Sequence, residues 1–188
     1  MQFFPTLLRF DDKSVLLVGG GEISLFKLQK IINFGPKNIK VISKEFSPEF
    51  KTFKTIELVQ KEFESSDLNG VDLAIIAIDD KEKQRIIYDI CKKQNILCNC
   101  VDLLDCCDFI FPSIVKRGDI SISISTNGKV PGLSAVLREY FEGLIPSDLE
   151  VVLKELTILR NSLTPGRERM QKIREAASVY IQEKFKWE

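Results

Sequence analysis

Three consecutive glycines between an apolar strand and an amphipathic helix constrain the fold of this chain more than any other feature. The strand is predicted over residues 15–18, directly before the glycines at 19–21, and a helical pattern of apolar residues follows. A strand, a glycine-rich turn and a helix in this order form the first unit of a dinucleotide-binding fold. Gly19 permits the tight turn, and Gly21 lets the backbone approach a pyrophosphate, which the first N–H groups of the helix can bind. Ser24 replaces the third glycine of the motif and is small enough for close helix–strand packing. The alternative is a glycine-rich turn that binds nothing.

The composition indicates a globular protein without a strong overall charge. The 188 residues include 27 Lys+Arg and 27 Asp+Glu, so no basic excess points to nucleic acid. No apolar run approaches the roughly 20 residues that a membrane helix needs. The first ten residues lack the basic region of a secretory signal. We therefore expect a cytoplasmic protein with neither a nucleic-acid nor a membrane partner.

Strands and helices alternate over the first hundred residues, as is typical of a parallel α/β sheet. After the first strand, further strands are predicted over residues 39–42, 56–59, 71–78 and 96–101. A helix is predicted over about residues 80–94, with Asp79 as its N-cap and Glu82 as the capping-box partner. This part of the chain should therefore form one open sheet covered by helices.

Ligands of open α/β sheets bind at the carboxyl ends of the strands, so polar residues at these ends are expected to converge on one site. The predicted cofactor-binding residues are Gly19, Gly21, Glu22, Ile23, Ser43, Lys44, Ile78 and Asp79. Asp102 stands at the end of the fifth strand. Because the chain contains no histidine, acid–base chemistry falls first to carboxylates such as Asp102. A role for Asp102 as a mere cap of the next turn is equally supported at this point, and Asp105 and Asp108 are nearby carboxylates.

Five cysteines lie within residues 91–107, but their spacing matches no C-x-x-C zinc motif. Reduced, half-buried thiols are the expected state, and no metal site is predicted.

The pattern changes after about residue 108. Strands are predicted over 108–115 and 119–125, joined by a turn at 116–118, and Ile120, Ile122 and Ile124 share one face of the second strand. Three helices are then expected. The first carries an apolar stripe over 133–144, the second is opened by a capping box of Ser147 and Glu150, and the third starts at Thr164-Pro165. So much apolar surface with so little mass to cover it favours a dimer.

The predicted fold class is therefore α/β, a Rossmann-like parallel sheet followed by a small α+β dimerisation domain and C-terminal helices. The expected domains are residues 1–112, 113–147 and 148–188.

Six segments, taken in order, resemble the precorrin-2 dehydrogenase/sirohydrochlorin ferrochelatase family, the amino-terminal region of siroheme synthase. They are residues 5–8, 18–23, 79–80, 99–102, 109–118 and 125–133, and the resemblance covers about residues 1–147. It implies an NAD-dependent oxidation of precorrin-2 to sirohydrochlorin. In many members of the family, insertion of Fe(II) to give siroheme follows. The resemblance also implies a homodimer built through the hairpin and the following helices.

The key carboxylate of the family falls on Asp102, which the resemblance implies to be catalytic. The tetrapyrrole is a polycarboxylate, so its site should carry cations. Residues Lys116, Thr126, Asn127 and Lys129 are the predicted substrate-binding residues, and Arg117 and Arg138 are further cations in the same segment. Ordinary solvated surface is the alternative for each of these cations.

Three questions stay open in the sequence. The second strand ends in Ser43-Lys44-Glu45, without the acidic residue that usually binds the ribose 2′-OH of NAD, so Lys44 leaves NADP open. Ile78 stands where the family usually has threonine, so any cofactor contact there must use the backbone. The chain could also be a dehydrogenase without chelatase activity, or a non-enzymatic module that senses NAD.

Overall fold

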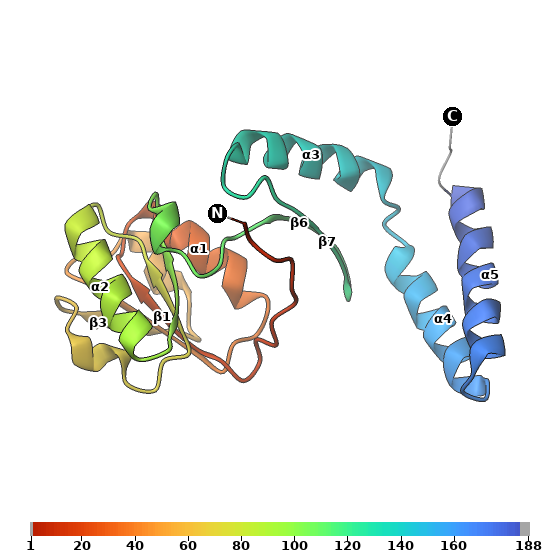
Figure 1. Ribbon diagram of the computed structural model, residues 1–188, viewed down its shortest axis with the longest axis horizontal. Helices are drawn as coiled ribbons and strands as arrows, with labels where there is room; N and C mark the ends of the chain where they lie inside the picture. The colour runs from red at the N-terminus through yellow and green to blue at the C-terminus, as the bar shows by residue number, and fades with distance from the viewer. Residues whose placement is uncertain (1, 185–188) are drawn as a thin grey trace. The chain divides into compact units, whose positions relative to one another are not determined.

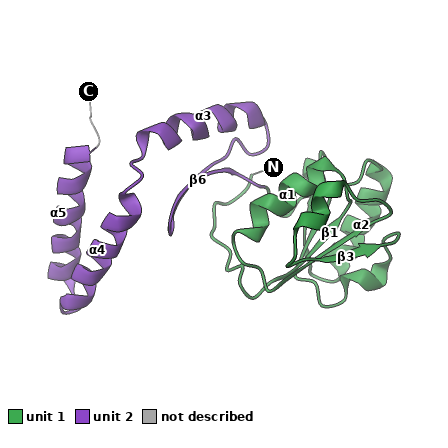
Figure 2. Cartoon of the chain, turned by 180° about the vertical axis from the view of Figure 1, so that it is seen from behind, with its two compact units in different colours: residues 1–110 green, residues 111–188 purple. Residues whose placement is uncertain are grey.

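The computed structural model describes residues 2–184. The chain divides into two compact units, residues 1–110 and residues 111–188, which Figure 2 shows in green and purple. No helix among the described residues is both long enough and apolar enough to cross a membrane.

The first unit is built on a five-stranded sheet in which all strands are parallel. Its strands are β1 (Ser14–Val18), β2 (Asn38–Ser43), β3 (Glu57–Gln60), β4 (Leu73–Ile76) and β5 (Leu97–Cys100). They lie in the order β3-β2-β1-β4-β5, so the direction of winding reverses between β1 and β4. The predicted Rossmann-like sheet is thereby confirmed. Such a reversal opens a crevice at the carboxyl edge of a doubly wound sheet, where ligands bind.

Helices α1 (Glu22–Ile32) and α2 (Lys81–Lys93) cover opposite faces of this sheet (Figure 1). On the face of α2, Leu16 and Val18 pack in one buried cluster with Ile87. On the face of α1, the helix buries Leu28 and Ile31. Because side chains alternate along a strand, an apolar run such as β1 supplies both layers of the core.

Short 3-10 helices form three of the remaining connections of the first unit. They are η1 (Pro48–Thr52), η2 (Ser65–Leu68) and η3 (Leu104–Cys106). The side chain of Phe50 in η1 is fully buried, so this connection helps to close the core.

The predicted N-cap of α2 is wrong by one residue. Asp80, rather than Asp79, caps the helix, because its carboxylate accepts a hydrogen bond from the Lys83 N–H at 3.0 Å. This shift leaves Asp79 outside the helix, at the carboxyl end of β4.

All five cysteines are free and buried in the first unit, more deeply than the half-buried state expected. The Sγ atoms of Cys98 and Cys100, two residues apart on β5, lie 3.8 Å apart. Burial raises the pKa of the Cys107 thiol to about 11. These thiols therefore behave as apolar core residues.

The second unit begins with an antiparallel hairpin of β6 (Ser113–Arg117) and β7 (Ile120–Ile124). The predicted turn at 116–118 is wrong, since Arg117 pairs with Ile120 and only Gly118 and Asp119 lie between the strands. Gly118 has a φ of +58°, which is the requirement at the first position of a type II′ turn.

Three helices complete the second unit: α3 (Pro131–Leu144), α4 (Leu149–Ser162) and α5 (Arg167–Lys184). The predicted capping box of Ser147 and Glu150 is absent. The N-cap of α4 is Asp148, whose carboxylate accepts a hydrogen bond from the Tyr180 hydroxyl at 2.8 Å and forms an ion pair with Lys184 at 3.2 Å. These two contacts tie the start of α4 to the end of α5.

The predicted start of α5 is also wrong. The helix begins at Arg167, so Pro165 precedes it instead of standing at its first position.

Few apolar side chains of the second unit are fully buried. Helices α4 and α5 contain no buried residue, and the one buried residue of α3 is Ser134. On α3, Val136 and Tyr140 are each 62% exposed. The predicted apolar stripe is therefore present, and the second unit does not bury it.

Candidate functional site

A cavity of about 580 Å³ opens in the first unit at the carboxyl ends of β1, β2, β4 and β5. Its lining consists of Gly19, Gly20, Gly21, Glu22, Ile23, Ser24, Ser43, Ala77, Ile78, Asp79, Lys81, Gln84, Val101 and Asp102. Every predicted cofactor-binding residue except Lys44 belongs to this lining, and so does Asp102. Segments far apart in the sequence therefore meet at the crevice where the sheet reverses its winding.

The backbone packs closely at two of the three glycines of the turn and is open at the third. Gly19 has a φ of +123°, and a Cβ there would lie 2.1 Å from the carbonyl oxygen of Ala77. A Cβ on Gly20 would lie 2.1 Å from the carbonyl oxygen of Glu45. A Cβ on Gly21 would meet nothing within 4 Å. The first two glycines thus let backbone segments pack together, whereas the third leaves an open approach to the backbone.

The amino terminus of α1 faces this opening. Its N-cap is Gly21, which has no side chain, and no side chain caps the first N–H groups of the helix. These N–H groups and the positive end of the helix dipole suit an anion such as a pyrophosphate.

Two buried polar atoms of the lining also lack a partner. Among the described residues, neither Ser24 Oγ nor Gln84 Oε1 has a hydrogen-bond partner. The Gln84 amide is oriented by its Nε2, which donates to the carbonyl oxygen of Ile78 at 2.6 Å. Buried polar groups are usually hydrogen-bonded, so these two atoms are free to bind a polar group in the cavity. Together with the glycine turn, these groups fit a bound dinucleotide.

Asp102 adopts a backbone conformation that is uncommon for a residue other than glycine. It follows β5 directly with a φ of +61°, which costs about 1 kcal/mol and is found preferentially at functional sites. Within the described part of the chain, its exposed carboxylate accepts no hydrogen bond. An Asp that only capped the next turn would bind a backbone N–H of that turn, so the geometry favours a role in the cavity.

Lys27 is a residue near Asp102 that the sequence analysis missed. It lies on α1, four residues after Ile23 and three after Ser24, and it is half-buried. Burial lowers the pKa of Lys27, and the negative charge of Asp102 opposes this effect. Its spacing from Ile23 and Ser24 was the available signal, since residues three and four apart share a helix face.

Lys44 lies outside the cavity lining. Its Nζ is 3.3 Å from Glu62 Oε1, and the Gln60 side chain donates to its backbone carbonyl at 3.0 Å. A direct contact of Lys44 with the cofactor therefore stays a prediction.

The predicted substrate-binding residues belong to the second unit. The hydroxyl oxygen of Thr126 accepts from the Val130 N–H at 3.1 Å, and Asn127 has a φ of +53°. These two residues shape a tight loop before α3. The side chains of Lys116 and Lys129 are exposed. Substrate binding by these four residues stays a prediction.

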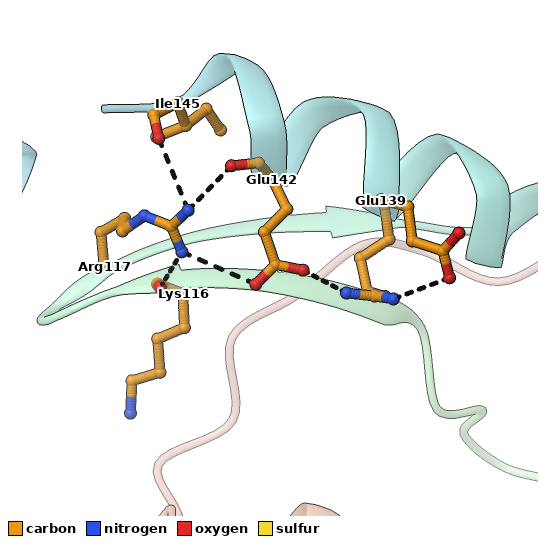
Figure 3. Close-up of polar contacts among 6 residues, drawn as sticks. Lys116, Arg117, Glu139, Glu142 and Ile145 are labelled. Carbon is orange, nitrogen blue, oxygen red and sulfur yellow. Dashed lines mark hydrogen bonds and ion pairs between the residues drawn. The ribbon is translucent and has the colours of Figure 1, made fainter. Parts of the chain in front are cut away.

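Two arginines of the same segment have structural roles, and Figure 3 shows the contacts of Arg117. Arg117 Nη2 donates to the backbone carbonyl of Glu142 at 2.8 Å and to that of Ile145 at 3.5 Å. Arg138 forms ion pairs with Glu142 and with Glu139. Arg117 thus satisfies carbonyl groups at the carboxyl end of α3 and fixes the hairpin to this helix.

Metal binding by the protein itself has no visible basis among residues 2–184, since no three Cys, Asp or Glu side chains gather there in a way that could hold an ion.

Comparison with known proteins identifies relatives named siroheme synthase. The chain is 36% identical over 149 residues to the siroheme synthase of Baumannia cicadellinicola subsp. Homalodisca coagulata, covering 78% of this chain and 32% of that protein. It is 34% identical over 191 residues to the siroheme synthase of Blochmanniella floridana, covering 100% of this chain and 39% of that protein. The chain thus spans about a third of the length of these relatives.

Among solved structures, "SirC, precorrin-2 dehydrogenase" matches 92% of this chain and 88% of its own with a TM-score of 0.74 and 22% sequence identity. This match confirms the predicted fold class. The family described as "Putative NAD(P)-binding" matches residues 6–113, which include the glycine turn and Asp102. The dinucleotide predicted from that turn agrees with this match, and the chain belongs to this NAD(P)-binding family.

Proposed function

We propose that this chain oxidises precorrin-2 to sirohydrochlorin with NAD as the hydride acceptor. The observation that carries the proposal is the cavity itself, where Asp102 in its left-handed conformation shares one lining with the glycine turn. The relatives named siroheme synthase and the fold of SirC support the choice of substrate.

The oxidation removes two hydrogens from the macrocycle, one as a hydride and one as a proton. The nicotinamide ring supplies the hydride acceptor when the cofactor is bound. Asp102 is the proposed general base, because its carboxylate is exposed to the cavity and has no hydrogen-bond donor among the described residues that would compete for it.

The cofactor is proposed to be held through the backbone. The N–H groups at the start of α1 bind the pyrophosphate, and Gly21 gives access to them. The backbone carbonyl of Ile78 accepts a hydrogen bond from Gln84 Nε2, which orients the Gln84 side chain in the cavity.

The proposal is tested by mixing the purified protein with precorrin-2 and NAD and following the formation of NADH and sirohydrochlorin. Asp102→Asn keeps the shape of the side chain, and asparagine tolerates a positive φ. We expect it to lower kcat by about 10²–10⁴-fold, the usual contribution of a general base, and to leave NAD affinity unchanged.

Asp105→Asn is the matched control, since Asp105 lies three residues away in an exposed ion pair with Arg85 at 2.6 Å. A normal rate for Asp102→Asn would contradict the mechanism. Binding of NAD without any turnover of precorrin-2 would favour a module that only senses NAD.

Insertion of Fe(II) is a second proposed activity, favoured by the printed names of the relatives. Asp102 could also accept the pyrrole protons that leave as the metal enters. A ferrochelatase assay with sirohydrochlorin and Fe(II) tests it, and loss of both activities in Asp102→Asn would show that one carboxylate serves both steps. Retention of chelation in that variant would assign the pyrrole protons to another group.

We further propose that the protein is a cytoplasmic homodimer. The support is the exposed apolar stripe of α3 and the absence of any buried residue in α4 and α5. Exposed apolar patches of this kind mark protein–protein interfaces.

A further inference from the structure

The end of β2 is the place where NAD-binding sheets usually present an acidic side chain to the adenosine ribose. Here β2 ends at Ser43, which lines the cavity, and the next residue is the cation Lys44. A lysine at this point would attract the 2′-phosphate of NADP. The choice between the two cofactors therefore depends on what lies beside Lys44.

A carboxylate from the connection after β3 lies beside Lys44. In the parallel register of β2 and β3, Ser43 is opposite Gln60, so residues just after β3 lie at the same edge of the sheet as Lys44. Glu62, two residues beyond β3, has its Oε1 at 3.3 Å from Lys44 Nζ. The Gln60 side chain, which donates to the carbonyl of Lys44, keeps the two connections together.

Glu62 also holds a second cation. Lys83, on the first turns of α2, binds the same Oε1 of Glu62 that Lys44 approaches. The hydrogen bonds from Lys83 and Lys44 lower the pKa of Glu62, so this carboxylate is ionised at neutral pH. One negative charge is thus shared between two lysines.

We propose that Glu62 is a specificity-determining residue that makes the dinucleotide site prefer NAD to NADP. Its carboxylate draws the ammonium group of Lys44 to itself and places a negative charge at the end of β2, where a 2′-phosphate would otherwise meet two uncompensated lysines. This inference rests on the dinucleotide site of the proposed function.

The charges determine the direction of the effect. Within the cluster of Lys44, Glu62 and Lys83 the net charge is one positive charge, and neutralising the carboxylate raises it to two. The extra phosphate of NADP is dianionic or nearly so, whereas a ribose 2′-OH is neutral. A substitution that neutralises Glu62 must therefore change the Kd of NADP much more than the Kd of NAD.

The experiment measures the Kd of NAD and of NADP by calorimetry for the unaltered protein and three variants. Glu62→Gln is expected to tighten NADP about tenfold and to leave NAD within about twofold. Lys44→Met in the Glu62→Gln background should reverse most of the gain for NADP. The side chain of Glu62 is 54% exposed, so the substitution should not unfold the protein, and circular dichroism verifies this.

Glu57→Gln is the matched control. Glu57 is the exposed first residue of β3, at the amino end of the strand that precedes Glu62, and its substitution removes the same charge. An equal ratio of the two Kd values in Glu62→Gln and Glu57→Gln would overturn the inference. Preferential binding of NADP by the unaltered protein would overturn it as well.

The readout separates this inference from the proposed function. A change in the ratio of the two Kd values supports the role of Glu62 even if precorrin-2 is not oxidised. If neither dinucleotide binds the unaltered protein, both the site and the inference fail.

Discussion

The two units use their apolar residues in opposite ways. In the first unit, the side chains of Leu16, Val41 and Ile75 are fully buried between the helices and the sheet. In the second unit, α4 and α5 bury no residue, and the stripe of α3 faces outward. The first unit is therefore stabilised by its own core, whereas the second leaves apolar side chains of α3 exposed. An amphipathic pattern predicts that a face will be covered, but it does not identify the covering surface.

The largest difference in stability between the units is expected for glycine substitutions. Gly19→Ala forces a Cβ against the carbonyl of Ala77 at a φ that alanine avoids, so it should destabilise the first unit by more than about 4 kcal/mol. Gly143→Ala, within α3, meets nothing within 4 Å and should stabilise by up to about 1 kcal/mol. Urea unfolding followed by circular dichroism measures both. A stable Gly19→Ala protein would show that the turn is less constrained than described.

Truncation of apolar side chains should also lower the free energy of unfolding more in the first unit than in the second. Ile76→Ala creates a cavity in the core and should lower the free energy of unfolding by about 2–5 kcal/mol. Val136→Ala removes an exposed side chain and should change the unfolding of the protomer by less than about 0.5 kcal/mol. Similar losses in urea unfolding would mean that the α3 stripe is buried within the protomer after all.

The proposed dimer predicts that a charge on the exposed stripe of α3 weakens association, whereas a charge on an exposed face of the first unit does not. Val136→Asp places a charge on the exposed stripe and should weaken association more than tenfold, which analytical ultracentrifugation at micromolar concentration measures as a shift to monomer. Ile86→Asp is the control, because Ile86 on α2 of the first unit is similarly exposed at 60%. Equal effects of the two variants would exclude the α3 stripe as the interface.

The smallest expected effect concerns the contact between α4 and α5. Burial, together with the hydrogen bond to Asp148, raises the pKa of Tyr180 from 10.0 to about 12. Between these values the folded chain holds a proton that the unfolded chain has lost, so this contribution is complete below about pH 10 and disappears as the pH rises to about 12.

Tyr180→Phe should therefore cost about 1 kcal/mol at neutral pH, and its difference from the unaltered protein should shrink across this range. Thermal unfolding at about pH 9 and about pH 11 measures the difference. A difference that stays constant would show that the hydroxyl does not contribute to stability.

Much of the first unit could be predicted because its signals are local. The apolar runs before Gly19 and Asp79 identify β1 and β4, and the glycine turn identifies the start of α1. The choice between Asp79 and Asp80 as N-cap could not be made, since both carboxylates precede the helix and only the geometry of Asp80 reaches Lys83.

The remaining parts of the site depend on contacts between distant residues. Glu62 lies 18 residues beyond Lys44, and the register of β2 with β3 is needed to see that they meet. Gln84 belongs to the cavity only because α2 packs on β4 and β5. In the second unit, Tyr180 and Lys184 bind Asp148, and this competition for its carboxylate is invisible in the local sequence.

The buried cysteines give the first unit a chemical signature that the second lacks. All five thiols of the chain are enclosed there, so a thiol-specific reagent can react only when the first unit opens. Alkylation would then measure the opening free energy of that unit, in the manner of hydrogen exchange. Separation of the proposed dimer and fraying of α4 and α5 would leave the labelling rate unchanged, so the first unit can be followed independently of the second in the intact chain.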